Sequence, residues 1–416
     1  MTPEVRERIE QIRHGIVPEG YKKVGTDVIP MDWSKVTFSD LGIIASGLVD
    51  PKTSPYLYMQ HIGPDSIEKN TGRILETQSA VELGLISGKF YFDTESIVYS
   101  KIRPNLNKVC APSFEGICSA DCYSIKPTKK ADKLYLLNLM LGDNFYKRAV
   151  ACSMRTGMPK INQDDLNIIP MCCPTSISEQ KKIAEIFTTQ DKVIELKEKL
   201  LAEKQRQKKY LMQQLLTGKK LLQGFDAEWE KTPLKKLLKE RKTYSPKGAE
   251  YPHVTLSTEG IYAKSDRYDR DHLVKDEDKE YKITHKGDIC YNPANLKFGV
   301  ICINNFGDAI FSPIYVTFEV VGNVSSAFLS NYLMRWDFIN AVRKYEEGTV
   351  YERMAVKPED FLKFEMMLPP YEEQVAIAEI LSVVDREIEL LRQDLEQEKQ
   401  KKKALLQLLL TGIVRV

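Results

Sequence analysis

One long stretch occurs twice in this chain, at a constant separation of 194 residues. The first copy spans residues 179–218 and the second spans residues 373–412, and no gap is needed to compare them. A repeat of 20–50 residues usually indicates a solenoid, whereas a period close to half of the chain indicates a duplicated domain. The positions that recur include Glu179, Gln180, Ile183, Ala184, Glu185, Ile186, Asp191, Ile194, Leu201, Leu215, Thr217 and Gly218.

Length and composition favour an ordinary globular protein with more than one domain. A chain of 416 residues is long enough for two or three domains with their own cores. No segment approaches the roughly 20 apolar residues of a membrane span, and the charged N-terminus lacks the apolar core of a signal peptide. The eight cysteines do not have the regular spacing of a disulfide framework. We therefore expect reduced thiols, a cytoplasmic protein and no zinc site.

The net charge is +2, and no domain is strongly basic because acidic and basic residues are interspersed along the chain. A protein of this kind can contact nucleic acid only through local basic patches. The charge balance therefore permits nucleic-acid binding without indicating it.

The residues before the first copy, which we call block one, predict a mixed domain. Residues 1–15 predict a short amphipathic helix, and residues 130–152 predict a longer helix with apolar side chains at helical spacing. Between them, short apolar runs alternate with Gly, Pro and Asn turns, which is typical of strands. The predicted strands cover residues 41–45, 56–61, 89–91, 96–102, 108–111, 123–126 and 167–171.

The residues between the two copies, block two, repeat this plan. Residues 288–292 correspond to the predicted strand at 96–100, and residues 309–312 correspond to residues 116–119. A predicted helix at residues 326–346 corresponds to residues 135–150. The order of the chain is therefore block, long helix, block, long helix.

Each repeated stretch predicts one long helix that needs a partner. Ser176 and Glu179 form a possible capping box, and Gly218 follows the last apolar turn as a typical helix stop. About 40 helical residues would extend about 60 Å, which no compact domain buries alone. In the second stretch a heptad seam, interrupted only at Glu398 and Lys402, runs through Ile377, Leu381, Val384, Ile388, Leu391, Leu395, Leu405 and Leu409.

The first stretch keeps the seven-residue step at Phe187, Ile194, Leu201 and Leu215, but its other seam position is polar at Gln190, Lys197 and Lys204. Two interpretations remain: the helices pack separately on their own blocks, or they pair with each other. We favour an antiparallel intramolecular pair, which would place the blocks at opposite ends. The polar positions predict less regular packing in the first helix.

Catalytic motifs are missing from the sequence. Neither the phosphate-binding G-x-x-x-x-G-K-[ST] pattern nor G-x-G-x-x-G occurs. Leu368-Pro369-Pro370-Tyr371 is similar to the N-P-P-Y tetrapeptide of amino-methyltransferases, but Leu368 cannot hold an amino group. Pro64-Asp65 with Glu68 and Lys69 has the wrong spacing for a nuclease site. A complete methyltransferase or nuclease is therefore disfavoured.

Taken together, the motifs resemble one known family. Each long helix opens with E-Q-x-x-I-A-E-I and closes with L-L-T-G, and block one carries SKIRPNLNKV. GYKKVGTDVIPMDW and LTGKKLLQGFDAEW lead into the two blocks, and LPPYEEQ precedes the second helix. In this order, and twice over, these motifs resemble the specificity subunit of type I restriction–modification systems across nearly the whole chain.

The resemblance implies an α+β fold with two similar target recognition domains of mixed and antiparallel β-structure with helices. Two long helices separate the domains and form an intramolecular antiparallel coiled coil. The implied boundaries are a first domain at 1–175, a spacer helix at 176–218, a second domain at 219–370 and a spacer helix at 371–416. Residues expected in the coiled coil and in subunit docking are Ile183, Phe187, Ile194, Leu201, Leu215, Ile377, Leu381, Ile388, Leu395 and Leu409.

The resemblance also implies that each domain reads one half of a split, asymmetric site in double-stranded DNA. Polar loops supply the candidate contacts, since lysine and arginine bind phosphates and asparagine or arginine can read base edges. In block one the candidates are Lys101, Arg103, Asn105, Asn107, Lys108, Arg155, Lys160 and Asn162. In block two they are Asn292, Asn295, Lys297, Arg343, Lys344, Tyr351, Arg353 and Lys357.

The implied partners are two methyltransferase subunits, which would use S-adenosylmethionine, and restriction and translocation subunits, which would use ATP and magnesium. The chain itself would be non-catalytic, without a cofactor or metal of its own and without a membrane. The alternative hypothesis is a coiled-coil scaffold with two protein-binding domains and no role in DNA recognition.

Overall fold

The computed structural model describes residues 2–153, 159–246, 250–264, 280–345 and 355–416. These residues fold into two compact units, and each long helix contributes to both. Unit one comprises residues 1–198 and 394–416, and unit two comprises residues 199–393. The unit borders fall within the long helices, so the domain boundaries inferred from sequence stay a prediction.

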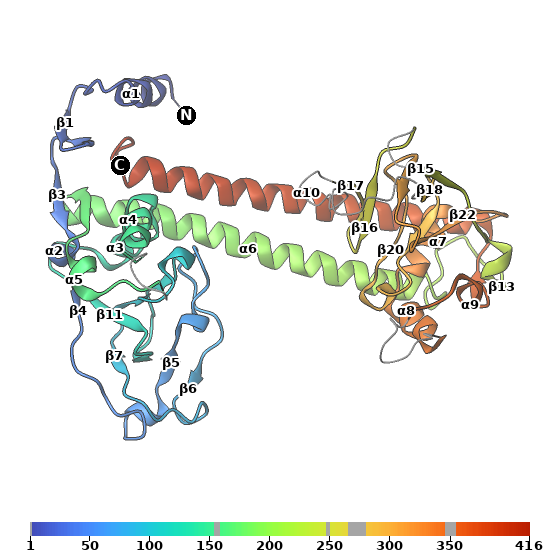
Figure 1. Ribbon diagram of the computed structural model, residues 1–416, viewed down its shortest axis with the longest axis horizontal. Helices are drawn as coiled ribbons and strands as arrows, with labels where there is room; N and C mark the ends of the chain where they lie inside the picture. Colours follow the sequence, from blue (N-terminus) through green and yellow to red (C-terminus); the bar gives the residue numbers. More distant parts are fainter. Residues whose placement is uncertain (1, 154–158, 247–249, 265–279, 346–354) are drawn as a thin grey trace. The chain divides into compact units, whose positions relative to one another are not determined.

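Unit one contains block one and parts of both long helices (Figure 1). Its helices are α1 (Pro3–Arg13), α2 (Phe38–Leu41), α3 (Lys133–Leu141), α4 (Asp143–Ser153) and α5 (Gln163–Asn167), with the 3₁₀ turns η1 (Tyr56–Tyr58), η2 (Pro64–Ser66) and η3 (Pro104–Leu106). Its strands are β1 (Tyr21–Val24), β2 (Asp27–Pro30), β3 (Trp33–Thr37), β4 (Gly42–Ile44), β5 (Gln60–Ile62), β6 (Gln78–Ser79), β7 (Phe90–Phe92), β8 (Ile97–Ser100), β9 (Val109–Cys110), β10 (Gly116–Cys118), β11 (Cys122–Pro127) and β12 (Pro170–Pro174).

Unit two contains block two. Its helices are α7 (Ser326–Leu333), α8 (Trp336–Val342) and α9 (Pro358–Phe361), with the turns η4 (Leu234–Lys236), η7 (Leu296–Phe298) and η8 (Arg343–Tyr345). Its strands are β13 (Glu230–Pro233), β14 (Leu238–Glu240), β15 (Tyr244–Pro246), β16 (Val254–Ser257), β17 (Gly260–Ala263), β18 (Glu280–Thr284), β19 (Ile289–Tyr291), β20 (Ile301–Ile303), β21 (Ala309–Phe311), β22 (Val316–Val320) and β23 (Glu365–Leu368). The long helices are α6 (Ile177–Leu215) and α10 (Tyr371–Leu409).

Corresponding sheets in the two units have the same strand order, which confirms the predicted duplication. The antiparallel sheet β4-β11-β8-β9 of unit one corresponds to β14-β22-β19-β20 of unit two. The pair β3–β12 corresponds to β13–β23, and each pair connects the entry of a block to its exit. A further sheet of block one, β6-β5-β10-β7, contains one parallel pair, so its β-structure is mixed.

Several predicted elements differ from the structure. The single helix predicted at residues 130–152 is two helices, because Gly142 between them has an extended backbone with ψ 152°. The helix predicted at residues 326–346 is likewise divided, because Arg335 is extended with ψ 134°. Apolar side chains continue at helical spacing across both breaks because the paired short helices share one core.

Three further local predictions need correction. Residues 56–58 of the strand predicted at 56–61 form a 3₁₀ turn, and the strand begins at Gln60. In the run predicted at 167–171 the chain is helical up to Asn167, because the Asn162 side chain caps that helix, and strand β12 begins at Pro170. Half of the predicted capping box forms: the Ser176 hydroxyl accepts from the Glu179 N–H at 3.5 Å.

The long helices pair antiparallel in each unit, as predicted. In unit one Gln190 donates to Glu398 at 2.7 Å, and Lys197 pairs with Asp394 at 2.7 Å. In unit two Lys204 pairs with Glu387 at 2.7 Å and Lys208 pairs with Asp385 at 2.6 Å. Residue numbers rise along one helix while they fall along the other, which defines the antiparallel direction.

The polar seam positions of α6 form hydrogen bonds or ion pairs with α10. Gln190, Lys197 and Lys204 each contact a carboxylate of α10, and Lys402 of α10 contacts Asp191 in return. Charge-assisted hydrogen bonds of this kind fix the register of two helices, as a polar core position does in a coiled coil. The polar positions therefore make specific contacts in each unit and are not simply weak points of the seam.

Glu398 gives this polar seam a dependence on pH. Hydrogen bonds from Gln190 and then from Lys197 lower the pKa of Glu398 to about 2, below its ordinary value of 4.5. A carboxylate whose pKa is lower in the folded state stabilises the fold above the unfolded pKa and loses that contribution as pH falls. We therefore expect the stability of unit one to decrease between pH 4.5 and 2, and the decrease to be smaller in Glu398→Gln. Urea unfolding at a series of pH values tests this, with Glu396→Gln on the exposed face as the control; identical profiles for the native chain and Glu398→Gln would contradict it.

The repeated Glu-Gln pair at the start of each long helix fastens the helix to its own block. The Gln180 amide accepts from the Asp132 N–H at 2.8 Å and donates to the Pro174 carbonyl at 2.9 Å. Gln374 makes the corresponding contacts with the Ser325 N–H and the Pro369 carbonyl, each at 2.8 Å. Asp132 and Ser325 are the N-cap residues of α3 and α7. The same glutamine therefore joins the same two places in both units.

The seam residues predicted for subunit docking are covered by the chain itself. Leu201 is half-buried, and the other nine predicted positions are buried. Ile183, Phe187 and Leu409 belong to the core of unit one, and Leu215, Ile377 and Leu381 belong to the core of unit two. These side chains serve folding, so a docking partner must use other faces of the helices.

No described helix is both long enough and apolar enough to cross a membrane. Within the same described ranges, no group of three or more His, Cys, Asp or Glu side chains is arranged to hold a metal ion.

Candidate nucleic-acid interface

Both units present a loop of the same construction at the end of the same strand. In unit one β8 leads into η3 and returns through β9, and in unit two β19 leads into η7 and returns through β20. Each 3₁₀ turn ends on a residue in the left-handed region, Asn107 with φ 46° and Gly299 with φ 80°. The two loops thus share a 3₁₀ turn with a left-handed last residue. They differ at the residue before the turn, which is left-handed at Arg103 (φ 48°) but not at Asn295 (φ −111°), and in their exposed side chains.

A second segment lies against each loop at a corresponding place. In unit one the Arg103 N–H donates to the Pro159 carbonyl at 2.8 Å, and the Tyr123 hydroxyl donates to the Ile161 carbonyl. In unit two the Val356 N–H donates to the Pro293 carbonyl at 3.3 Å, and the Tyr291 hydroxyl donates to the Val356 carbonyl. Each unit therefore brings together the two polar segments that the sequence singled out.

The candidates of block one divide into a surface group and an internal group. Arg103, Asn105 and Lys160 are exposed, and Lys101 is half-buried with its ammonium 5.2 Å from the Tyr123 ring centroid. Burial, and then the like charge of Lys160, lower the pKa of Lys101. A phosphate group placed here would relieve the repulsion between Lys101 and Lys160, so these residues can contact the phosphate backbone of DNA. We call Lys101, Arg103 and Lys160 the block-one basic cluster.

Three candidates of block one have internal roles in the structure. Asn107 is buried and its amide donates to the Leu141 carbonyl at 3.2 Å. Lys108 points inward and donates to the Pro64 carbonyl at 2.6 Å. Asn162 is exposed, but its side chain caps α5 through the Asp165 N–H at 2.7 Å. In this conformation these groups shape the site and are not presented to a base edge.

Block two has a similar division. Asn295 is exposed, and Lys297 lies with its ammonium 5.4 Å from the ring centroid of Phe298, which is itself 60% exposed. Asn292 is buried, and its side-chain oxygen accepts from the Ala294 and Asn295 N–H groups at 3.1 and 3.3 Å. Asn292 therefore builds the turn that Asn295 and Lys297 occupy.

Three further candidates of block two are described by the structure, and all three are exposed. Arg343 and Lys344 are exposed on η8, and Lys357 is exposed at the N-cap of α9. Arg155, Tyr351 and Arg353 lie outside the described residues.

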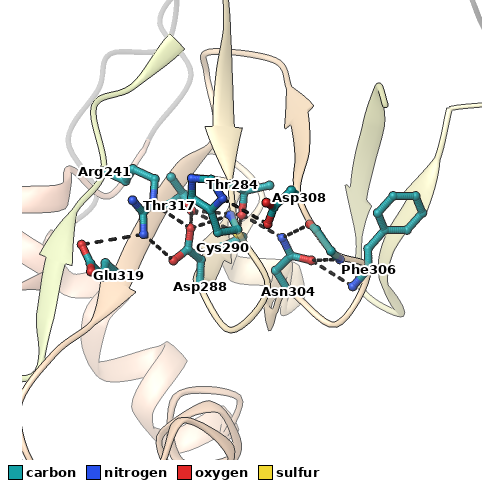
Figure 2. A network of polar contacts seen from close by, with 11 residues as sticks. Arg241, Thr284, Asp288, Cys290, Asn304, Phe306, Asp308, Thr317 and Glu319 are labelled. Atoms are coloured by element: carbon teal, nitrogen blue, oxygen red, sulfur yellow. Dashed lines mark hydrogen bonds and ion pairs between the residues drawn. The ribbon is translucent and has the colours of Figure 1, made fainter. Parts of the chain in front are cut away.

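A polar network holds the base of the block-two loop (Figure 2). The Arg241 guanidinium donates to both oxygens of the buried Asp288 at 2.9 and 3.1 Å. Asp288 also accepts from the His285 N–H at 2.8 Å, and Asn304 donates to Thr284 at 3.0 Å. Because Asp288 directly precedes β19 and Asn304 directly follows β20, the network closes the end of the hairpin opposite η7. A buried network with its members paired makes this support rigid.

Sequence reasoning missed the residues that fasten the blocks to the helices, although one signal was present. The Trp33 indole donates to Glu179 at 3.3 Å, and the Trp229 indole donates to Glu373 at 3.1 Å. The glutamates recur with the helices, and each tryptophan stands at the entry of its block. The tryptophans and the glutamates each belong to a recurring motif, but the sequence does not show that the two motifs are in contact.

The chain has duplicated loops, a shared strand order and an antiparallel helix pair. The family model of the DNA specificity domain of type I restriction–modification systems matches it twice, which defines its class. The model, described as the type I restriction modification DNA specificity domain, matches residues 30–205 and 225–400. The chain therefore belongs to this family.

Two curated relatives illustrate the similarity. The specificity subunit of the type I restriction enzyme EcoDI from Escherichia coli is 38% identical over 169 residues, which span 40% of this chain and 37% of that protein. A putative type I restriction enzyme MjaX specificity subunit from Methanocaldococcus jannaschii is 25% identical over 437 aligned positions, which span 96% of this chain and 97% of that protein.

Solved structures share the fold. A chain from a study of complex assembly and conformational transition of the type I R-M system has a TM-score of 0.61 at 16% identity, covering 93% of this chain and 99% of that chain. The S subunit from M. genitalium has a TM-score of 0.56 at 13% identity, covering 95% and 99%. At these identities the likeness shows the fold alone.

Proposed function

We propose that this chain is the sequence-reading subunit of a type I restriction–modification complex, in which each block reads one half of a bipartite, asymmetric DNA site. One observation carries the proposal: two copies of a specificity domain present equivalent loops with different exposed side chains. The positions of Arg103 and Asn105 in the block-one loop correspond to those of Asn295 and Lys297 in the block-two loop. Turns on equivalent strands that carry different exposed side chains suit two readers of different sequences.

The proposed division of labour follows from the chemistry of the two groups of side chains. Lysines of the block-one basic cluster suit phosphates, which position the protein without reading sequence. Exposed Arg103, Asn105 and Asn295 can make the bidentate contacts that distinguish base pairs in the major groove. Asn107, Lys108, Asn162 and Asn292 are assigned a supporting role, because their side chains are engaged within the protein.

The partners belong to the same proposal. The paired helices would hold the two readers at a set spacing and dock two methyltransferase subunits, whose S-adenosylmethionine and base-binding pocket would supply the chemistry. Ile380, Val383 and Leu390 of α10 keep exposed apolar side chains on one face and are suited to such docking. Restriction and translocation subunits would supply ATP- and magnesium-dependent steps. We place the complex in the cytoplasm, and this chain is non-catalytic within it.

The test asks whether substitutions in the two blocks affect different half-sites. The chain and its methyltransferase are used to select sequences from a pool of split, randomised DNA sites by gel shift. We expect one bipartite consensus, in which Arg103→Ala relaxes one half and Asn295→Ala relaxes the other, each by about 1–3 kcal/mol. Lys160→Ala should weaken binding to all sequences and reduce its salt dependence.

Lys181→Ala is the matched control, because Lys181 is an exposed lysine on α6 outside both loops. Selection of no consensus would support the alternative of a protein-binding scaffold. Relaxation of the same half-site by Arg103→Ala and Asn295→Ala would contradict the assignment of one block to each half.

A further inference from the structure

The two glutamates that open the long helices have different surroundings, although they occupy equivalent positions. In unit one the guanidinium of Arg415 donates to both oxygens of Glu179, at 2.7 and 3.0 Å, and Trp33 donates to one of them. Arg415 also donates to both oxygens of Asp32, at 2.9 and 2.6 Å. One arginine therefore joins two carboxylates beside a tryptophan.

In unit two the same acceptors are present, but none of the described arginines pairs with them. Trp229 donates to Oε2 of Glu373 at 3.1 Å, while Oε1 of Glu373 is buried without a hydrogen-bond partner. Glu228 directly precedes Trp229, as Asp32 directly precedes Trp33. Arg415 lies three residues after Gly412, and the residue three positions after Gly218 is Leu221, which is 49% exposed.

An unpaired buried carboxylate is costly, because burial removes its hydration and nothing replaces it. Burial raises the pKa of Glu373, whereas the pKa of Arg415 beside Glu179 is raised above its ordinary value by its hydrogen bonds to Asp32 and Glu179. Unit two therefore has the anionic half of the arrangement, and no residue that the structure describes there supplies the cation.

A surface depression marks the corresponding place in unit two. It has a volume of about 310 Å³ and is lined by residues that include Gly218, Leu221, Glu228, Trp229 and Met367. Trp229 is partly exposed, whereas Trp33 is buried. In unit one the chain end covers this place: Tyr21 donates to the Gly412 carbonyl at 2.7 Å, and a Cβ on Gly412 would approach the Trp33 ring.

We propose that unit two carries a socket for the guanidinium group of an arginine supplied by a second polypeptide, with Glu373 and Glu228 as acceptors and Trp229 as the wall. A guanidinium fits better than an ammonium because its planar fork can donate to two carboxylates at once, as Arg415 does. The donor is a polypeptide because the arginine of unit one belongs to a segment without helix or strand that is held through the backbone carbonyls of Gly412 and Ile413. Glu373 is fully covered, so entry requires a local movement of the half-exposed segment after Gly218. The proposal does not depend on DNA binding.

The experiment uses the full chain labelled with 5-fluorotryptophan, whose three tryptophans give separate fluorine NMR signals. The probe is the peptide acetyl-Ile-Val-Arg-Val, the sequence of residues 413–416. We expect the peptide to shift the signal of Trp229, assigned with Trp229→Phe, and to leave that of Trp33 unchanged because Arg415 already fills that site. The same peptide with citrulline in place of arginine should give no shift, and Glu373→Gln should weaken binding at least about tenfold.

Two further variants make the result decisive. Arg415→Gln should open the site in unit one, so that the peptide then shifts Trp33 as well. Leu221→Arg should fill the site in unit two with the chain's own arginine, abolish the response of Trp229 and raise the melting temperature relative to Leu221→Gln. Equal shifts with the citrulline peptide, or an unshifted Trp229 signal together with no stabilisation by Leu221→Arg, would overturn the proposal.

Discussion

A chain truncated before Glu373 should lose the folded state of both units, and with it all selection of a split DNA site. The deletion removes Ile377 and Leu381 from the core of unit two, and Leu409 and Leu410 from the core of unit one. Loss of one such buried side chain costs about 2–5 kcal/mol, against a total stability of about 5–15 kcal/mol for a typical domain. Circular dichroism and hydrogen exchange would show the loss of cooperative structure.

The matched control for this truncation is deletion of residues 413–416 alone. That deletion removes the Arg415 contacts with Glu179 and Asp32 but leaves Leu409 and Leu410 in place. We expect this shorter deletion to remain folded with reduced stability. The truncated chain could instead still show a cooperative unfolding transition and bind the same split site. In that case the proposed role of α10 in both cores would be wrong.

Substitution of one repeated helix position should damage one unit and spare the other. Phe187 and Leu381 are equivalent in the repeat, and both are fully buried, but Phe187 lies in the core of unit one and Leu381 in that of unit two. We expect Phe187→Ala to destabilise unit one by about 3–5 kcal/mol and Leu381→Ala to destabilise unit two by about 2–5 kcal/mol.

Hydrogen exchange resolved along the sequence measures the two effects separately. Protection of Ile97–Ser100 should fall in Phe187→Ala, and protection of Ile289–Tyr291 should fall in Leu381→Ala. Val383→Ala is the control, since that side chain is 60% exposed on α10. An equal loss of protection in both strands for either variant would mean that the units unfold as one body.

The sequence predicted the duplicated plan well because the repeat is nearly uninterrupted in the long helices. Heptad spacing also located the buried side of α10, since five of the eight seam positions are buried and the other three are half-buried. The helix breaks at Gly142 and Arg335 were missed, because each pair of short helices packs into one core and preserves the helical spacing across the break. Local periodicity reports which side chains are buried and not whether the backbone between them is continuous.

The candidate interface was predicted only in part. Both loops were located, because an Asn-rich and Lys-rich turn between two strands is visible in sequence. Which asparagines are exposed was not visible: Asn107 and Asn292 build their turns, whereas Asn105 and Asn295 reach solvent. Asparagine both stabilises turns and reads bases, and only the backbone geometry separates these two uses.

The position of Leu409 and Leu410 in the core of unit one bears on the order in which the protein is made. Block one is synthesised before block two, but Leu409 and Leu410, which complete the core of unit one, are added after all of residues 199–393. Unit two needs only residues 199–393 and can be completed earlier in synthesis. Nascent domains generally fold in order from the N-terminus. Here block one precedes block two in synthesis but completes its core after it, so a chain released before Leu409 is added leaves the core of unit one open.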